Sequence, residues 1–472
     1  MTGTPRLSAG VGRCDITPPV GIVHTNWGAA IHARAERIDM PLRARALAVR
    51  DAETGTTAVL IDLDLLLLPR AIADALRGAV ADLTGVPAEH VRVSATHTHS
   101  GPTIGSTWVS EGTEYVQPYV GALPGKVAGA AWEAVRSLRP ARVAHGTGQS
   151  DLGVNRRVRG PDGRVLVGRN PDGFVDRVVR VLRVDDADER PLAAVVHYGC
   201  HPIIMSWENT AITPDYPGPT RETVERLTGA TCLFFQGCAG NIGPNVFGWE
   251  GRTGDPGVYR RAGTMLGAEA ARVFLGLEPR RREVRFDRVL ESGAPLAVYH
   301  HDPTEEPDGT VRVAGAEVAL PVRPFPTRSE GETAAAAARE ELARLRAAHA
   351  PDEEVRDATM RAKRAAQQAG HSRLTDGRRG VTVEAQAVRI GGAALLGAPM
   401  EVFSEIGAQI AERSPFGWTA VSGYTNGSTG YLPTAEAHDE GGYEVERASP
   451  YAREAGAAFA AEAGRLLARL RD

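Results

Sequence analysis

The sequence predicts an α/β protein in which mixed sheets are flanked by helices. Short runs rich in β-branched residues alternate with stretches rich in Ala, Leu and Arg, and loops rich in Gly, Pro, His and Asn separate them. Strands that alternate with helices favour parallel pairing within a sheet. The expected strands are residues 57–66, 91–95, 192–197, 231–235, 381–390, 393–396 and 419–424. The expected helices are residues 70–83, 119–138, 219–227, 258–275 and 401–413.

Two further segments have patterns of their own. Residues 175–184 mix apolar and charged side chains, which predicts a half-exposed strand paired with a hairpin around residues 161–163. Ser449-Pro450 combines an N-cap with a proline at the first helical position, so it predicts the start of a C-terminal helix. An apolar stripe indicates that this helix is packed, and it consists of Leu466, Leu467 and Leu470.

Residues 332–370 stand apart because they are rich in Ala, Glu and Arg. They predict two helices joined by a tight turn, with Pro351 near the start of the second helix and Gly370 as its C-cap. We expect an exposed helical hairpin inserted in the fold at residues 328–372. A purely structural role is favoured over binding to a partner.

The composition is that of an average globular protein, and it excludes several function classes. Of the 472 residues, 42% are hydrophobic and 24% charged, and the net charge of −4 argues against a nucleic-acid partner. No apolar run approaches the ~18 residues that span a bilayer, and the first residues lack the apolar region of a signal peptide. Four cysteines without CxxC spacing indicate a reduced chain. We therefore expect a cytoplasmic protein without stable membrane association, and the sequence leaves its oligomeric state open.

The strongest local signal for chemistry is His97-x-His99, which follows the expected strand 91–95. Residues i and i+2 of an extended chain face the same side, so both imidazoles can converge on one point. His201 and Glu401 also follow expected strands, and open α/β sheets build their sites at the carboxyl ends of strands. Two or three histidines with a carboxylate suit Zn²⁺, with one position left for water or substrate. Histidines buried as hydrogen-bonded core residues are the alternative.

Two loop features remain open between a structural and a functional interpretation. A Gly-rich loop at residues 235–245 allows backbone N–H groups to approach an oxyanion, or it contains tight turns that need positive φ. Tryptophans near the motifs either pack in the core, which is favoured, or line a substrate pocket. They are Trp27, Trp108, Trp207 and Trp249.

Several short motifs occur in one order along the chain. They are residues 10–18, Thr96-His-Thr-His-Ser-Gly-Pro102, Asn155-Arg156-Arg157, His201-Pro202, residues 236–245, Pro399-x-Glu401, Asn426-x-x-x-x-Tyr431 and Tyr443-Glu444. Together they resemble the catalytic domain of the neutral, non-lysosomal ceramidases from about residue 8 to residue 446, which is nearly the whole chain.

The resemblance implies a ceramidase-like α/β fold and one catalytic Zn²⁺ per chain. The implied metal ligands are His97, His201, Glu401 and Tyr431. His99 and Arg156 would then face the substrate. Asp64, or alternatively Asp62, would hydrogen-bond a metal ligand and orient it. Because ligands from distant parts of the chain must meet at one point, we expect residues 1–472 to form a single domain.

The sequence also departs from the family pattern. Asn241 replaces an aspartate, and Gly243 replaces a serine that the family places near the metal. A glycine cannot act as a nucleophile, so metal-activated water or a substrate hydroxyl must do so. About 26 residues follow Glu446, where ceramidases have an immunoglobulin-like domain, so we expect neither that domain nor a secretory leader. These features favour a soluble small-molecule substrate over a membrane lipid.

We therefore expect a zinc-dependent amidohydrolase that cleaves the N-acyl amide bond of a soluble small molecule with metal-activated water. His99 is expected to act as general base or proton shuttle. Contacts to the substrate or its oxyanion are expected from Arg156, Tyr443, Asn155, Gly240, Asn241 and Gly243. The alternatives are ester or lactone hydrolysis, acyl transfer or amide formation on a small metabolite, and a non-catalytic binding protein.

Overall fold

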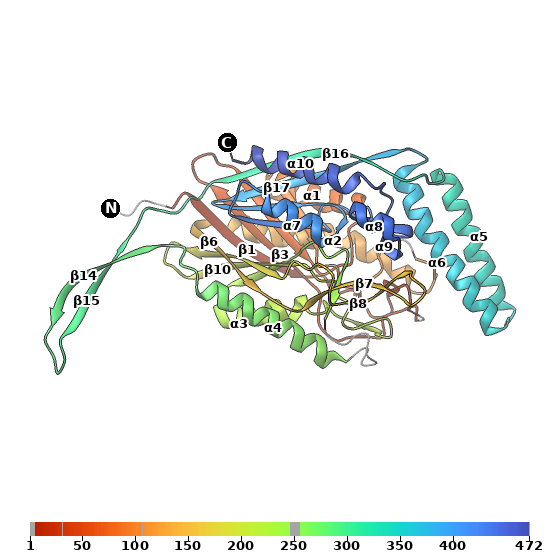
Figure 1. Ribbon diagram of the computed structural model, residues 1–472, viewed down its shortest axis with the longest axis horizontal. Helices are drawn as coiled ribbons and strands as arrows, with labels where there is room; N and C mark the ends of the chain where they lie inside the picture. The colour runs from red at the N-terminus through yellow and green to blue at the C-terminus, as the bar shows by residue number, and fades with distance from the viewer. Residues whose placement is uncertain (1–4, 31, 106, 246–254, 472) are drawn as a thin grey trace.

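Two β-sheets packed face to face form the centre of the molecule, and helices cover their outer faces (Figure 1). The computed structural model describes residues 5–30, 32–105, 107–245 and 255–471. The eight-stranded sheet has the order β12 (Thr231–Gln236), β10 (Pro191–Tyr198), β9 (Val178–Asp186), β6 (Arg139–Gln149), β1 (Leu7–Asp15), β3 (Arg43–Asp51), β4 (Thr57–Leu63) and β5 (Val91–Ala95). The four-stranded sheet has the order β16 (Val311–Pro321), β17 (Gly380–Ile390), β18 (Ala393–Gly397) and β20 (Trp418–Ser422).

The helices form the two outer layers. On the larger sheet lie α1 (Arg70–Thr84), α2 (Val116–Arg136), α3 (Pro217–Thr228) and α4 (Pro256–Leu275). On the smaller sheet lie α7 (Ser404–Glu412) and α10 (Ala455–Arg469). In β4, Val59 and Ile61 pack toward α1 and α2, whereas Ala58 and Leu60 pack toward the smaller sheet. Burial on both faces explains the continuous apolar sequence of this strand. The expected α/β class with mixed sheets is confirmed.

The expected parallel pairing occurs at three places in these two sheets. β4 pairs with β5, β10 with β12, and β18 with β20. The other pairs of the larger sheet are antiparallel. The alternation of strands and helices therefore predicted that parallel pairs occur, but not which strands form them and not the antiparallel centre of the sheet.

The predicted partner of residues 175–184 is wrong. These residues contribute to β9, which pairs with β6 and β10 in the larger sheet. The hairpin around residues 161–163 does form, from β7 (Gly153–Arg159) and β8 (Val165–Asn170), but it pairs with β13 (Ile242–Pro244). The charged side chains of β9 had indicated exposure, yet nearby carboxylates neutralise them, as in the ion pair of Arg183 with Asp185.

Two predicted helix starts are also wrong. The helix expected from residue 401 begins at Ser404, and Glu401 lies instead in β19 (Glu401–Val402), which pairs in parallel with β21 (Tyr431–Leu432). The last helix begins at Ala455, because the Ser449 hydroxyl accepts a hydrogen bond from the Tyr451 N–H in a separate turn. The apolar stripe of this helix is buried, as expected.

The predicted helical hairpin is present as α5 (Arg328–Ala347) and α6 (Asp352–Thr375), and it stands at one end of the molecule (Figure 1). Thr327 and Glu330 form a capping box at its start. Gly370 is not the C-cap: α6 continues to Thr375, and Asp376 ends it in a left-handed conformation. The extra turns carry buried side chains, which explains why the helix continues.

A two-stranded arm was not expected. β14 (Arg282–Leu290) and β15 (Leu296–Pro303) pair with each other and extend away from the sheets (Figure 1). Separately, none of the helices within the described ranges has the length and apolar character that crossing a membrane requires.

Buried polar contacts link β4, which lies next to one edge of the eight-stranded sheet, to the opposite edge strand β12 and to helix α3. Asp62 on β4 accepts hydrogen bonds from the backbone N–H of Phe234 on β12 (2.8 Å) and from Arg221 on α3 (2.8 Å). Asp64, directly after β4, accepts from the other arm of the Arg221 guanidinium (2.6 Å) and from the Thr96 hydroxyl (3.2 Å). Thr96 precedes His97, so the ion pairs also hold the loop that carries the first histidine.

Replacing Arg221 by methionine should lower the free energy of unfolding by about 3–5 kcal/mol, because two buried carboxylates lose their counter-charge. Urea denaturation followed by tryptophan fluorescence measures this loss. In a matched control, Arg272→Met removes a surface ion pair with Glu269 and should cost less than about 1 kcal/mol. Equal losses in the two variants would show that the buried pairs have no special role.

Candidate functional site

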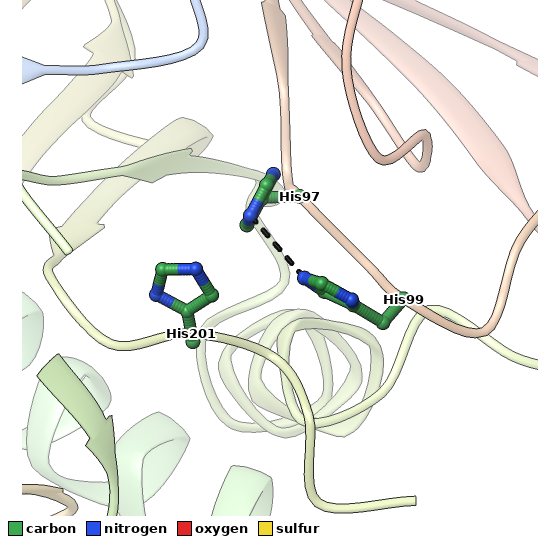
Figure 2. Close-up of side chains that lie close together, drawn as sticks. All are labelled: His97, His99 and His201. Atoms are coloured by element: carbon green, nitrogen blue, oxygen red, sulfur yellow. Dashed lines mark hydrogen bonds between the residues drawn. The ribbon is translucent and has the colours of Figure 1, made fainter. Parts of the chain in front are cut away.

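Three histidine side chains converge on one point (Figure 2). His97 and His99 follow β5, and His201 follows β10, as the sequence predicted. Each histidine offers one ring nitrogen, and these three nitrogen atoms all lie within 4.8 Å of one another. The dashed line in Figure 2 joins Nε2 of His97 to Nε2 of His99, which are 3.3 Å apart.

His97 reaches this point from a left-handed backbone conformation, with φ at +68°. The sequence had suggested an extended chain through both histidines, but β5 ends at Ala95, and the His97 N–H donates to the Leu65 carbonyl. A residue other than glycine in such a sparsely populated region costs about 1–3 kcal/mol and is concentrated at functional sites. The convergence was predicted correctly, and the backbone geometry behind it was not.

Backbone carbonyls fix the same tautomer in all three rings. Nδ1 of His97 donates to the Leu66 carbonyl (2.6 Å). Nδ1 of His99 donates to the Asn26 carbonyl (3.1 Å), and Nδ1 of His201 donates to the Ala239 carbonyl (2.6 Å). Because a carbonyl only accepts, each neutral ring turns an unprotonated Nε2 toward the others. These lone pairs repel one another unless a cation lies among them. Metal-binding histidines have the same arrangement, in which the second ring nitrogen donates to a carbonyl or carboxylate.

Glu401 and Tyr431 join the cluster from the paired strands β19 and β21, where they are register partners. Oε2 of Glu401 lies 3.4 Å from Nε2 of His97 and 3.3 Å from Nε2 of His201. The Tyr431 hydroxyl lies 3.2 Å from Nε2 of His201. The four ligands that the family resemblance implies are therefore together, with His99 beside them. Which of these five residues bind an ion stays a prediction.

Tyr424 also contacts the cluster, although the sequence gave it no role. Its ring stacks on His97 with 4.0 Å between centroids, and its hydroxyl lies 3.5 Å from Oε2 of Glu401. The only sequence signal was its place at the end of an expected strand, before the Asn426 motif. Its φ of +54° places a second left-handed residue at the site.

Burial determines how the cluster is protonated. It lowers the pKa of His99 well below 6.5 and that of His201 to about 3. Burial alone would raise the pKa of Glu401, but the imidazoles of His97 and His201 hold it well below its usual value. The rings of His99 and His201 are therefore neutral at neutral pH, and with the ionised carboxylate of Glu401 they form a donor set that suits a divalent cation such as zinc.

Arg156 places a positive charge beside this donor set. Its guanidinium donates to the Tyr431 hydroxyl (3.0 Å) and to Glu444 (2.8 Å). Burial would lower the pKa of Arg156, but Tyr431 and Glu444 raise it, so the charge is kept. The Tyr443 ring lies 6.0 Å from the Tyr431 ring, and its side chain is 41% exposed.

The Gly-rich loop packs against the site, and three of its N–H groups are bonded within the fold. The N–H groups of Gly237, Gly240 and Ile242 donate to the carbonyls of Tyr198, Val402 and Ala239. A Cβ on Gly240 would lie 2.5 Å from the Glu401 carbonyl oxygen, so glycine is needed there for close packing. The expected oxyanion role of Gly240 is therefore corrected to a structural one.

Three other predicted contacts find no support in the geometry. The amide groups of two asparagines are engaged within the fold, Asn241 with Glu405 and Ser404, and Asn155 with Phe174 and Arg157. Gly243 pairs with Val154 in the β13–β7 ladder, and a Cβ there would lie 3.5 Å from Cβ of Arg156. A serine would therefore fit at this position, but the chain has none there.

A pocket of about 600 Å³ borders the loops whose carbonyls orient two of the histidines, and the histidines themselves are not among the described residues that line it. It is lined by Leu66 and Asn26, whose carbonyls orient His97 and His99, and by Tyr443. Its other walls include Trp27, Trp108 and residues of α6. The pocket-lining alternative thus holds for these two tryptophans, whereas Trp207 contacts Trp27 edge-on and Trp249 lies outside the described residues.

Comparisons with known proteins agree with this geometry. The family described as neutral/alkaline non-lysosomal ceramidase, N-terminal, matches residues 7–260, which is more than half of the chain. The chain is similar to a neutral ceramidase from Pseudomonas aeruginosa, with 28% identity over 251 residues (50% of this chain and 37% of that protein). It is also similar to neutral ceramidase A from Dictyostelium discoideum, with 27% identity over 275 residues (53% of this chain and 38% of that protein).

The fold comparison covers more of the chain. A crystal structure of neutral ceramidase from Pseudomonas aeruginosa has a TM-score of 0.71 and 22% identity, and it covers 99% of this chain and 75% of that one. This likeness shows the fold. The sequence matches span little more than a third of each of the two curated relatives.

The chain should bind one divalent metal ion. The substitution His201→Ala or Glu401→Gln should weaken this binding at least about tenfold, because removal of a residue that only hydrogen-bonds a metal ligand already has an effect of that size. Elemental analysis after chelation, addition of Zn²⁺ and dialysis measures the bound metal. His145→Asn alters a half-buried histidine on β6 and should keep full metal content. A His201→Ala variant that still holds one ion with unchanged affinity would contradict the proposed cluster.

Proposed function

Because the chain belongs to the neutral/alkaline non-lysosomal ceramidase family, we propose that it is a zinc-dependent hydrolase that cleaves the amide bond of an N-acyl small molecule. The observation that carries this proposal is the cluster of three unprotonated Nε2 atoms with Glu401 and Tyr431, placed beside a pocket. When bound, a divalent ion polarises a carbonyl oxygen and lowers the pKa of nearby water from about 15.7 toward about 7. His97, His201, Glu401 and Tyr431 would hold it.

His99 is the best candidate for moving a proton. Its Nδ1 is engaged by the Asn26 carbonyl, so Nε2 is the nitrogen that can accept a proton from water and return it to the leaving amine. The Trp27 ring lies 5.3 Å from the His99 ring and shields one side of it. His99 therefore combines a fixed orientation with a ring contact to Trp27, which lines the pocket.

Arg156 and Tyr443 would stabilise the oxyanion of the tetrahedral intermediate. Glu444 holds the Arg156 guanidinium in place, so its charge needs no reorganisation during the reaction. Tyr443 faces the pocket, and its ring lies beside that of Tyr431. These two side chains take over the role that the Gly-rich loop cannot fill.

The nucleophile is water in this proposal. Gly243 offers no hydroxyl, and the neighbouring thiol of Cys238 is buried and donates to the Val421 carbonyl. Burial raises the pKa of Cys238, which removes the thiolate needed for attack. We also propose a soluble substrate, because polar side chains share the pocket lining with the tryptophans, among them Thr25, Asn26 and Gln367.

Chelator-treated protein should lose hydrolysis of N-acyl amides and regain it when Zn²⁺ is added. A panel of N-acyl amides with acyl chains of increasing length, each beside its matched ester, measures the reaction by release of the amine or alcohol. Full activity after metal removal would contradict the metal requirement. Cleavage of esters alone would contradict the amidase assignment.

Tyr443→Phe should lower kcat for the amide about 10²–10³-fold, the usual loss for one oxyanion donor, while metal content stays constant. Steady-state kinetics and elemental analysis check both quantities. Tyr299→Phe, on the exposed arm, removes a hydroxyl far from the pocket and serves as the control. An unchanged kcat in Tyr443→Phe would exclude the hydroxyl from catalysis.

A further inference from the structure

The inserted hairpin forms a wall of the pocket, although the sequence favoured a purely structural role for it. Helix α6 supplies several lining residues, among them Met360, Lys363, Arg364 and Gln367. Gln367 of this helix and Tyr443 line the same pocket. The hairpin therefore shares the pocket with a residue that the proposed function places at the oxyanion.

Lys363 and Trp108 fasten the hairpin to the body. The Lys363 ammonium donates to the carbonyls of Gly28 (2.7 Å) and Ala30 (3.1 Å) and lies 4.3 Å from the centroid of the Trp108 ring. Trp108 also packs among buried side chains of α5 and α6. These contacts fix α6 at a defined distance from the histidines, as a binding wall requires.

The charge of the lining is one-sided. Three cationic side chains line the pocket, Lys363, Arg364 and Arg447, and no aspartate or glutamate is among the described residues that line it. Neither Arg364 nor Arg447 has a hydrogen-bond or ion-pair partner for its guanidinium among the residues that the structure describes. A pocket lined by one sign of charge concentrates ligands of the opposite sign.

The two arginines are placed to act together. Arg364 precedes Gln367 by three residues on α6, and Arg447 follows Tyr443 by four residues, with its N–H bonded to the Tyr443 carbonyl. Each therefore lies within about one turn, along its own segment, of another residue that lines the pocket. Guanidinium groups bind oxyanions through paired N–H donors.

Part of the remaining lining is apolar. This part consists mainly of Trp27, Leu66, Leu67, Ile104, Trp108 and Met360, and polar side chains such as Thr25, Asn26 and Gln367 lie beside it. An apolar lining with a cationic edge suits an amphipathic ligand, which has an acyl chain at one end and an anionic group at the other.

We propose that the pocket selects N-acyl substrates whose amine part carries an oxyanion, a carboxylate or a sulfonate, and that Arg364 and Arg447 recognise this group. The proposal rests on the amide hydrolysis proposed above and names its substrate class. The acyl chain lies against the tryptophans, the amide lies at the histidine cluster, and the anionic group faces α6.

Kinetics on three compounds of similar size test this selection. N-lauroylglycine carries a carboxylate, N-lauroyltaurine a sulfonate and N-lauroylethanolamine no charge. The ratio of kcat/KM for each anionic compound to kcat/KM for the neutral one should exceed about tenfold, and each Arg→Gln change should lower it about fivefold, because exposed charge contacts are individually modest. The double variant Arg364→Gln/Arg447→Gln should bring the ratio near one. Arg361→Gln, on the same helix but outside the lining, should keep it.

Equilibrium dialysis of the same compounds against chelator-treated protein gives a readout that does not need turnover. The anionic compounds should bind more tightly than the neutral one, and the difference should shrink in the double variant and in about 1 M salt, where the Debye length is about 3 Å. Equal binding of charged and neutral compounds, or a preference that survives the double variant, overturns the proposal.

The two experiments separate the two proposals. If no N-acyl compound is cleaved by any form of the protein, the proposed amidase function fails, and dialysis still decides whether the pocket prefers anions. If the neutral compound is cleaved as well as the anionic ones, the amidase function stands and the anion selectivity is wrong. A response to only one of the two anions identifies the group that the arginines recognise.

Discussion

The hydrogen bond from the Phe234 N–H on the edge strand β12 to Asp62 on β4 closes the eight-stranded sheet, Arg221 on α3 neutralises Asp62 and Asp64, and the site depends on this closure. His97 follows the edge strand β5, and His201 follows β10, which lies next to the opposite edge strand β12. In an open sheet of this strand order, the two loops would be separated by most of its width. The curled sheet brings them within hydrogen-bond distance of the same carboxylate, that of Glu401. Burial of three charges is costly, and here it positions the loops that carry the histidines.

A second constraint acts at the level of the backbone. Carbonyls of Leu66, Asn26 and Ala239 set the tautomers, and these carbonyls belong to loops that the two sheets place. The left-handed conformation of His97 directs its ring into the cluster, so the strain at this residue is offset by the surrounding hydrogen bonds. The donor atoms are therefore oriented before any ion binds, which reduces the reorganisation that binding requires.

The sequence predicted the parallel strands and the loops after them, because buried strands with apolar runs are strong local signals. It also predicted that His97, His201, Glu401 and Tyr431 meet, through the order of their motifs. It did not predict how they meet. Glu401 was placed at a helix start, whereas it is aligned with Tyr431 by a two-residue ladder that has no local signature. The oxyanion role of the Gly-rich loop failed for a related reason: where an N–H group donates depends on carbonyls distant in the sequence, such as that of Val402 for Gly240.

The hairpin shows where composition misleads. Its Ala, Glu and Arg content is that of a solvated helix pair, and most of its surface is exposed. One face of α6 nevertheless closes the pocket, because Lys363 and Trp108 attach it to loops that lead to the histidines. The histidine cluster comes from strand ends that the packed sheets fix, whereas this wall comes from a helical hairpin at one end of the molecule. In such an architecture the chemistry and the choice of substrate reside in different parts of the chain. Family membership therefore constrains the reaction more closely than it constrains the molecule on which the reaction acts.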